Sequence, residues 1–165
     1  MATDLALEAL RRALVLEKEG MLFYGEASKK VQDAATQKMF VTLLSDEKQH
    51  QKMLRAQMQA LKENKGWRTH PTTSKARLLE GAPSLFPKGK ASLDKISETS
   101  TDIEAIRFGL DIENKSFEFY FKASQESETS EGRSMYTLLA EKERDHFNTL
   151  MMRLEGLAGP LGWTY

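Results

Sequence analysis

Glu47-Lys48-Gln49-His50 and Glu143-Arg144-Asp145-His146 are the stretches that decide the fold, because the same Glu-x-x-His spacing occurs twice, 96 residues apart. Leu43 and Leu54 flank the first stretch, and leucines flank the second at the same spacing. Residues three apart on a helix lie on one face. Both Glu and His pairs are therefore expected to point into the core of a helical domain.

The repeat extends outward from these stretches to a second acidic position. Glu17 and Glu113 each lie 30 residues before the Glu of the motif, among apolar residues at helical spacing, and Tyr24 and Tyr120 each follow seven residues later. Sliding the sequence over itself by 96 residues also superposes many apolar positions without a gap. The sequence therefore predicts one helical hairpin that is used twice.

Four segments carry the apolar recurrence of amphipathic helices, and β-like alternation is not sustained. The sequence predicts an all-α protein with a single domain over residues 1–165, in keeping with its length. The predicted helices span residues 3–30, 33–64, 101–127 and 130–155. Short turns within each pair predict antiparallel hairpins at about 3–64 and 101–155.

The segment between the hairpins is predicted to be a long crossover over residues 65–99, because it holds three of the four prolines. Connections of this length usually contain some structure, so a helical turn at 74–80 and packing of Leu85 and Phe86 on the bundle are expected. Residues 156–165 form a tail in which Gly156, Gly159 and Pro160 are expected to end the last helix. Its two terminal aromatic residues predict docking on the bundle or on a neighbouring subunit.

Composition excludes several classes of function. Basic and acidic residues number 24 each, so no net charge attracts nucleic acid or anionic lipid. The sequence contains no cysteine, which excludes disulfides, thiolate zinc sites and iron–sulfur centres within it. No apolar run has the ~18 residues of a membrane span, and the N-terminus does not resemble a signal peptide. These features predict a cytoplasmic protein without nucleic-acid or membrane partners, in which any metal is bound by nitrogen and oxygen.

The predicted core contains charged groups that need a positive partner. They are the side chains of Glu17, Glu47, His50, Glu113, Glu143 and His146. Unpaired buried carboxylates are costly and repel one another, and the adjoining inward positions hold no Lys or Arg. A Glu from each of two helices plus Glu-x-x-His from each of the other two is the di-iron or di-manganese arrangement of ferritin-like bundles. Two alternatives to a metal site are a solvated helix face and a duplicated site that has lost its metal.

These motifs resemble the rubrerythrin family of the ferritin-like superfamily, and the likeness covers nearly all of the four helices. It rests on Glu17-Lys-Glu-Gly-Met-Leu-Phe-Tyr24, Asp46-Glu47-Lys-Gln-His50, Glu113-Asn-Lys-Ser-Phe-Glu-Phe-Tyr120 and Glu143-Arg-Asp-His146. The resemblance implies a ferritin-like antiparallel four-helix bundle in which the six Glu and His residues bind two iron ions, with manganese or zinc as substitutes in the purified protein.

The resemblance also implies roles for individual residues. The ligands that bridge the two ions would include either Glu47 and Glu143 or Glu17 and Glu113. Tyr24 and Tyr120 would hydrogen-bond to ligand carboxylates. Judged from the residues alone, each Tyr could equally be a core aromatic with a satisfied hydroxyl.

Two features depart from the family pattern, and Asp46 beside the first motif has two interpretations. Classical rubrerythrins add a rubredoxin domain with a cysteine-bound iron, which a chain without cysteine does not form, so the electron donor is expected to be a separate protein such as a rubredoxin. Ser116 stands where the family has an additional Glu one turn after Glu113, so the peroxide-reducing mode built on that Glu is not carried over. Asp46 either hydrogen-bonds to a ligand His across the bundle or is solvated, and its counterpart in the repeat is Lys142.

The function that the resemblance implies is reduction of peroxide or dioxygen by a di-iron protein, with a homodimer expected. One alternative is an iron oxidation and storage protein of ferritin type, which needs a hollow shell. Another is a di-iron hydroxylase resembling the quinone monooxygenases, which predicts a membrane-facing surface. His70, in the proline-containing crossover, is interpreted as a surface histidine rather than a ligand.

Overall fold

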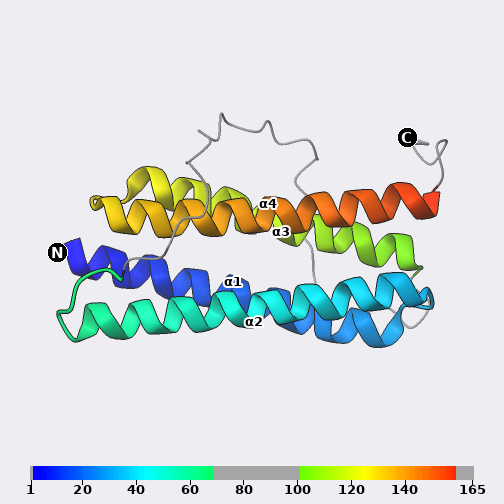
Figure 1. The fold of residues 1–165 in the computed structure, drawn as a ribbon, viewed down its shortest axis with the longest axis horizontal. Helices are drawn as coiled ribbons and strands as arrows, with labels where there is room; N and C mark the ends of the chain where they lie inside the picture. The colour runs from blue at the N-terminus through cyan, green and yellow to red at the C-terminus, as the bar shows by residue number, and fades with distance from the viewer. Residues whose placement is uncertain (1, 69–100, 159–165) are drawn as a thin grey trace.

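The computed structural model describes residues 2–68 and 101–158. These ranges contain four α-helices and no strand: α1 (Ala2–Lys30), α2 (Ala34–Lys62), α3 (Asp102–Glu126) and α4 (Ser130–Ala158). Helices α1 and α2 form one antiparallel hairpin, α3 and α4 form a second, and the hairpins pack into a four-helix bundle (Figure 1). The prediction of an all-α four-helix bundle is confirmed. None of the described helices combines the length and apolar character needed to cross a lipid bilayer.

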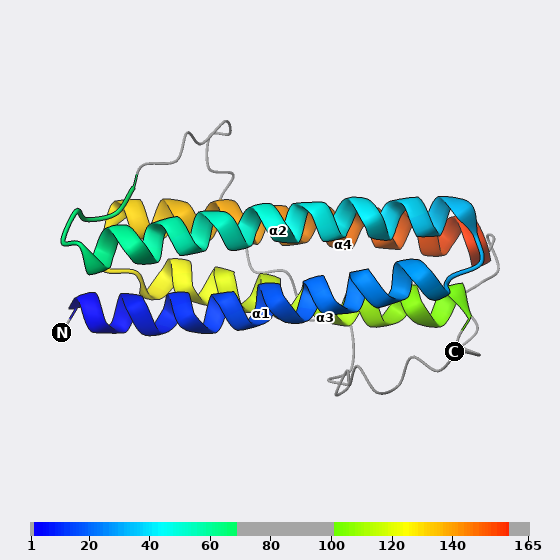
Figure 2. The ribbon, with the colours of Figure 1, turned by 90° about the horizontal axis from the view of Figure 1, so that it is seen from below.

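The two hairpins are arranged so that equivalent helices face each other. Figure 2 shows α1 beside α3 in one layer and α2 beside α4 in the other. The end of α2 and the start of α3 lie at opposite ends of the bundle (Figure 1), which agrees with a long connection between the hairpins. The predicted turn at 74–80, the expected packing of Leu85 and Phe86, His70 and the tail from residue 159 all lie outside the described residues.

Side-chain caps begin α2 and α3. Asp33, the N-cap of α2, accepts a hydrogen bond from the backbone N–H of Thr36 at 2.7 Å. Thr101 and Glu104 form a capping box at the start of α3, in which each side chain accepts a hydrogen bond from the backbone N–H of the other residue. Caps of this kind satisfy backbone donors that have no partner within a helix. Both helices consequently begin within a residue of their predicted starts.

Helix α4 passes the first of the three residues expected to end it. The sequence places the end at about Glu155, with Gly156, Gly159 and Pro160 as terminating residues, and α4 continues through Gly156 to Ala158. The physical reason is the next apolar position, because Leu157 packs against the buried cluster at this end of the bundle. That contact offsets the cost of a helical glycine, which is about 1 kcal/mol relative to alanine.

The core consists of two apolar clusters with a polar layer between them. One cluster lies toward the turn between α1 and α2 and is formed around Phe23, Tyr24, Phe40, Leu43, Ile106, Leu110 and Leu150. The other lies toward the opposite end and is formed around Leu10, Leu54, Leu61, Tyr120, Met135, Tyr136 and Leu139. The polar layer is therefore shielded from water along the axis of the bundle on both sides.

Candidate metal centre

All four helices contribute acidic or histidine side chains to the polar layer. Helix α1 contributes Glu17, α2 contributes Glu47 and His50, α3 contributes Glu113, and α4 contributes Glu143 and His146. Each of these residues is at most 7 % exposed. Thus the structure brings together the six residues that the sequence singles out, and it buries them rather than leaving them on a solvated face.

The six residues form two overlapping groups of potential metal ligands. Within each group, one ligand atom per residue lies within 4.8 Å of all the others; the groups are Glu17, Glu47, His50 and Glu143, and Glu47, Glu113, Glu143 and His146. Only Glu47 and Glu143 belong to both groups. A carboxylate has two oxygen atoms and can serve two positions at once. Of the two bridging pairs considered from the sequence, the geometry favours Glu47 and Glu143.

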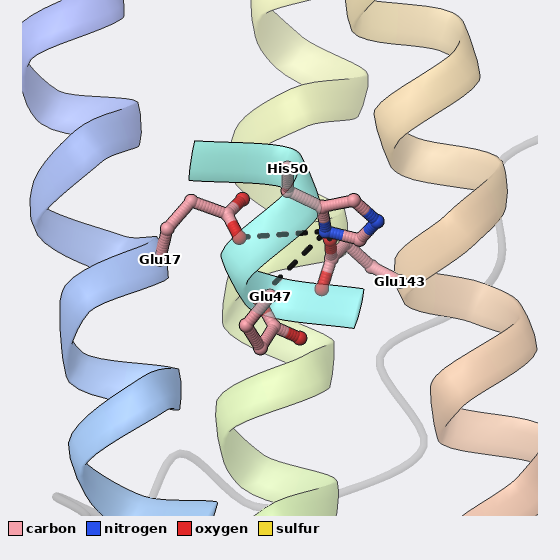
Figure 3. Close-up of side chains that lie close together, drawn as sticks. All are labelled: Glu17, Glu47, His50 and Glu143. Atoms are coloured by element: carbon pink, nitrogen blue, oxygen red, sulfur yellow. Dashed lines mark ion pairs between the residues drawn. The ribbon is translucent and has the colours of Figure 1, made fainter. Parts of the chain in front are cut away.

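His50 directs its Nδ1 atom into the first group. This atom lies 3.1 Å from Oε1 of Glu143, 3.4 Å from Oε2 of Glu17 and 3.7 Å from Oε2 of Glu47. Figure 3 shows the carboxylates converging on this nitrogen from α1, α2 and α4. The imidazole and three carboxylates can therefore reach a common point.

His146 occupies the equivalent place in the second group. Its Nδ1 atom lies 3.1 Å from Oε1 of Glu47 and 3.4 Å from Oε2 of Glu113. The His146 ring stacks on the His50 ring with a centroid separation of 5.4 Å. On the other side of the ring, Nε2 lies 3.5 Å from Oδ2 of Asp46, so Asp46 approaches a histidine across the bundle rather than standing apart in solvent.

The donor atoms that face the centre have no hydrogen-bond partner among the described residues. They are Oε2 of Glu17 and Glu113, Oε1 of Glu47 and Glu143, and Nδ1 of His50 and His146. Buried polar atoms in folded proteins nearly always have hydrogen-bond partners, so six buried polar atoms around one point without such partners need an explanation. Carboxylate oxygen and imidazole nitrogen together suit iron, manganese and zinc. The residues present therefore fit a pair of divalent metal ions.

Burial shifts the pKa values of the cluster strongly. Burial raises the pKa of Glu17 to about 8, and the neighbouring Glu47 adds to that shift. Burial also raises the pKa of Glu143 well above its usual range, with repulsion by Glu113 as the next cause. Burial alone would lower the pKa of His146, but the adjacent carboxylates of Glu113 and Glu47 raise it to about 11. The pKa of Glu47 is lowered instead, despite its burial, by Glu17 and the two histidines. The cluster therefore holds an excess of negative charge, which divalent cations would satisfy.

Two buried tyrosines connect α1 and α3 at the cluster. The hydroxyl of Tyr24 donates a short hydrogen bond to Oε1 of Glu113, and the hydroxyl of Tyr120 donates one to Oε1 of Glu17. Burial, followed by the adjacent carboxylate charge, raises the pKa of each phenol well above its usual value, so both remain protonated donors. In Glu17 and Glu113 one oxygen is thus bound to a tyrosine, and the orphaned oxygen faces the centre. Such partners orient metal ligands.

The sequence profile of the family described as Rubrerythrin matches residues 8–154. The chain belongs to the rubrerythrin family. This family consists of di-iron carboxylate proteins, and the recognition made from the motifs is confirmed. A solved structure, that of a hypothetical protein from Pyrococcus furiosus, is 24 % identical and superposes with a TM-score of 0.63, covering 97 % of this chain and 92 % of the other. That likeness shows the ferritin-like fold alone. A search of curated proteins found no match.

This member of the rubrerythrin family has small residues at two equivalent positions beside the cluster. Ser116 and its counterpart in the repeat, Gly20, are both buried. A Cβ atom on Gly20 would lie 3.5 Å from the carboxylate of Glu47, so the position has room for a small residue only. Because neither position holds an acidic residue, the described donor set keeps the two-fold symmetry of the repeat.

A groove between α2 and α4 opens this rubrerythrin-family site to the surface. It has a volume of about 450 Å³ and is lined by Leu43, Asp46, Lys142, His146 and residues of the adjoining turns. The groove reaches His146, so a small molecule entering it would arrive beside the second donor group. Sequence analysis did not predict the groove, because the spacing of α2 from α4 depends on how the hairpins pack.

Proposed function

We propose that this protein is a di-iron redox protein that reduces peroxide or dioxygen with electrons from a separate donor. The observation that carries the proposal is the pair of overlapping donor groups that share Glu47 and Glu143. Six ligands from four helices can hold two ions a short distance apart, which is the arrangement needed to deliver two electrons to one O–O bond. Membership of the rubrerythrin family supports iron as the metal.

Each residue of the site has a separate task in this proposal. His50 and Glu17 would hold one ion, His146 and Glu113 would hold the other, and the shared carboxylates of Glu47 and Glu143 would be available to both. When bound, the iron pair would supply the electrons that cleave the O–O bond. Tyr24 and Tyr120 fix the terminal carboxylates through their hydrogen bonds. The groove at His146 supports entry of a molecule as small as hydrogen peroxide.

The proposal includes the setting in which the protein acts. The 165 residues contain no cysteine with which to bind a rubredoxin-type iron, so we assign electron supply to a separate protein such as a rubredoxin. A homodimer in the cytoplasm is part of the same proposal.

Replacement of Glu47 by Ala tests the shared ligand. The variant removes an oxygen donor from both groups, so bound iron should fall from about two ions per chain to nearly none. Iron should also raise the melting temperature of the parent protein but not that of the variant, because a ligand stabilises only a fold that binds it. Metal analysis and thermal unfolding with and without iron measure both effects. Glu19→Ala, an exposed position on α1, is the matched control and should keep its iron.

The reaction is tested on the iron-loaded protein after anaerobic reduction. Hydrogen peroxide should oxidise the iron on the time scale that a stopped-flow experiment resolves. About one peroxide should be consumed per iron pair. Dioxygen oxidation that leads to a mineral core inside a hollow shell would instead identify a ferritin-type storage protein. A Glu47→Ala protein that retained its iron would contradict the ligand assignment on which the proposal depends.

A further inference from the structure

Three aromatic residues lie in a row from the cluster to one end of the bundle. Tyr120 donates its hydroxyl proton to Oε1 of Glu17. Its ring stacks on that of Tyr136, with centroids 6.4 Å apart and planes inclined by 24°. The Tyr136 ring contacts the indole of Trp67 at 5.8 Å in an edge-on arrangement. Trp67 is half-buried, so the row runs from a carboxylate of the cluster to the surface.

Several independent contacts hold Trp67 in this position. Gln57, which is fully buried in α2, accepts a hydrogen bond from the backbone N–H of Arg68 at 2.9 Å and donates one to the carbonyl oxygen of Gly66. The indole lies directly on Gly132 of α4, where a Cβ atom would come within 2.9 Å of it. The residues on both sides of Trp67 are therefore tied to the bundle, and a glycine makes room for its ring.

Among the described residues, the other half of the repeat has no such row. Tyr24 is the counterpart of Tyr120 and makes the equivalent hydrogen bond to Glu113. Its described ring neighbours, however, are Phe23 at 5.1 Å and Phe40 at 5.6 Å, and Phe40 occupies the position equivalent to Tyr136. Within the part of the chain that the structure describes, only the row that starts at Tyr120 therefore ends on a tryptophan.

We propose that Trp67, Tyr136 and Tyr120 form an electron path that connects the surface with the metal centre. The inference rests on the redox function proposed above and assigns the point at which electrons enter. A separate one-electron donor would reduce the molecule at Trp67, at the end of the bundle formed by the start of α4 and the end of α2 (Figure 1).

The steps balance for single electrons. With hydrogen peroxide as the terminal oxidant, Tyr120 would give one electron toward the cluster and its phenolic proton to Oε1 of Glu17, which would leave a neutral phenoxyl radical. An electron from the indole of Trp67 and the proton from Glu17 restore the phenol. The external donor then reduces the indole radical cation. Two such electrons, with two protons from water, convert one hydrogen peroxide into two water molecules.

Tyr136 acts in this path through its ring rather than its hydroxyl. Its hydroxyl is buried and has no hydrogen-bond partner among the described residues, so none of these residues is placed to take its proton. Burial also raises the pKa of this phenol. Its ring bridges the other two rings, and the hydroxyl is dispensable. The two substitutions Tyr136→Phe and Tyr136→Leu should therefore differ, because only the first keeps the aromatic ring.

The path can be tested without turnover, in protein loaded with redox-inert zinc. A Trp163→Phe background leaves Trp67 as the only tryptophan, and pulse radiolysis with the azide radical oxidises the indole. The indole radical should decay as a phenoxyl radical appears, at a rate independent of protein concentration. Tyr120→Phe should abolish this transfer, Tyr136→Leu should slow it at least tenfold, and Tyr136→Phe should leave it within about twofold of the background protein.

The matched control is Tyr24→Phe, because Tyr24 is equally buried and is bound to the equivalent carboxylate, and its ring neighbours among the described residues are phenylalanines. This variant should keep the phenoxyl yield unchanged. A phenoxyl signal that survives Tyr120→Phe, or that is lost equally in Tyr24→Phe, would overturn the path. The zinc content of the same samples, measured by metal analysis, tests the metal site separately. Absence of bound zinc would contradict the proposed function. Bound zinc without radical transfer would contradict only the electron path.

Discussion

Gly109 and Gly156 are both helical glycines, but their surroundings are opposite. A Cβ atom on Gly109 would lie 3.1 Å from Cδ1 of Leu150 and 3.4 Å from the hydroxyl oxygen of Tyr24. Leu150 is fully buried, and the Tyr24 hydroxyl is bound to Glu113, so neither neighbour is free to move. A Cβ atom on Gly156 would meet no atom within 4 Å. Close packing beside the tyrosine thus depends on the absence of a methyl group at Gly109.

We expect Gly109→Ala to lower the free energy of unfolding by about 1–3 kcal/mol, because an added methyl group in a packed core forces its neighbours to shift. Gly156→Ala should raise it by up to about 1 kcal/mol, because alanine is the better helix former and has room. Urea denaturation of both variants measures the difference. If both substitutions raised the free energy of unfolding equally, Leu150 and Tyr24 would have to shift away from the added methyl group without loss of packing energy.

At the scale of the elements, the turn between α1 and α2 is tied to both helices of the second hairpin. The Asp102 carboxylate, at the start of α3, accepts hydrogen bonds from the backbone N–H groups of Gln32 at 2.9 Å and Asp33 at 2.7 Å. Arg153 of α4 forms an ion pair with Asp33 and donates to Oγ1 of Thr36 at 2.9 Å. Asp33 therefore serves as the N-cap of α2 and as a link to α4.

The pKa of Asp33 is lowered, first by the hydrogen bond from the backbone of Thr36 and further by the Thr36 hydroxyl and Arg153. Because the pKa is lowered by folding, the charged form of Asp33 stabilises the folded protein at pH values above the pKa of Asp33 in the unfolded chain, which is near 4. This stabilisation is lost as the pH falls through the lower pKa that Asp33 has in the folded protein. Asp33→Asn should therefore destabilise the protein at pH ~7 and have a smaller effect at pH ~3. Chemical denaturation at both values measures the change.

Glu26→Gln is the control for this prediction. Glu26 also has a lowered pKa, caused mainly by its hydrogen bond with Lys29, but both side chains are exposed on α1. Exposed ion pairs within one helix contribute little to stability. At both pH values, Glu26→Gln should change the free energy of unfolding by less than Asp33→Asn does. A pH dependence as large as that of the Asp33 variant would indicate that general surface charge, rather than the link to α4, causes the effect.

For the whole molecule, the packing of the hairpins is uneven. Helices α1 and α3 approach closely, whereas α2 and α4 contact each other at few points and leave the groove between them. The groove reaches His146 of the second donor group. A route from solvent to that group therefore follows from the uneven packing of the hairpins.

Thr42→Trp places a large ring in the groove, since Thr42 is an exposed residue that lines it. We expect peroxide to oxidise the reduced iron centre about tenfold more slowly in this variant, with iron content unchanged, because the ring narrows the way in. Stopped-flow mixing measures the rate. Gln49→Trp, on an exposed face of α2 outside the groove, should react like the parent protein. Equal rates in all three proteins would show that peroxide reaches the centre by another way.

Helix positions and ligand types could be predicted from the sequence because both depend on local spacing. The 96-residue repeat and the Glu-x-x-His pairs are enough to place charged groups on inward helix faces. The passage of α4 through Gly156 could not be predicted, since the cost of this glycine is offset by a contact of Leu157 that only packing reveals. The row from Trp67 to Tyr120 could not be predicted for the same reason, because its members come from three separate segments.

By itself, the sequence determined four amphipathic helices, a duplicated hairpin and six candidate ligands, because periodicity and residue chemistry are properties of the chain. Only the tertiary structure decided that Glu47 and Glu143 are shared by both donor groups, that each tyrosine binds a carboxylate of the opposite hairpin, and that the groove opens at His146. These features depend on distances and angles between helices. Such distances follow from the packing of whole side-chain surfaces, which no spacing along a single helix encodes.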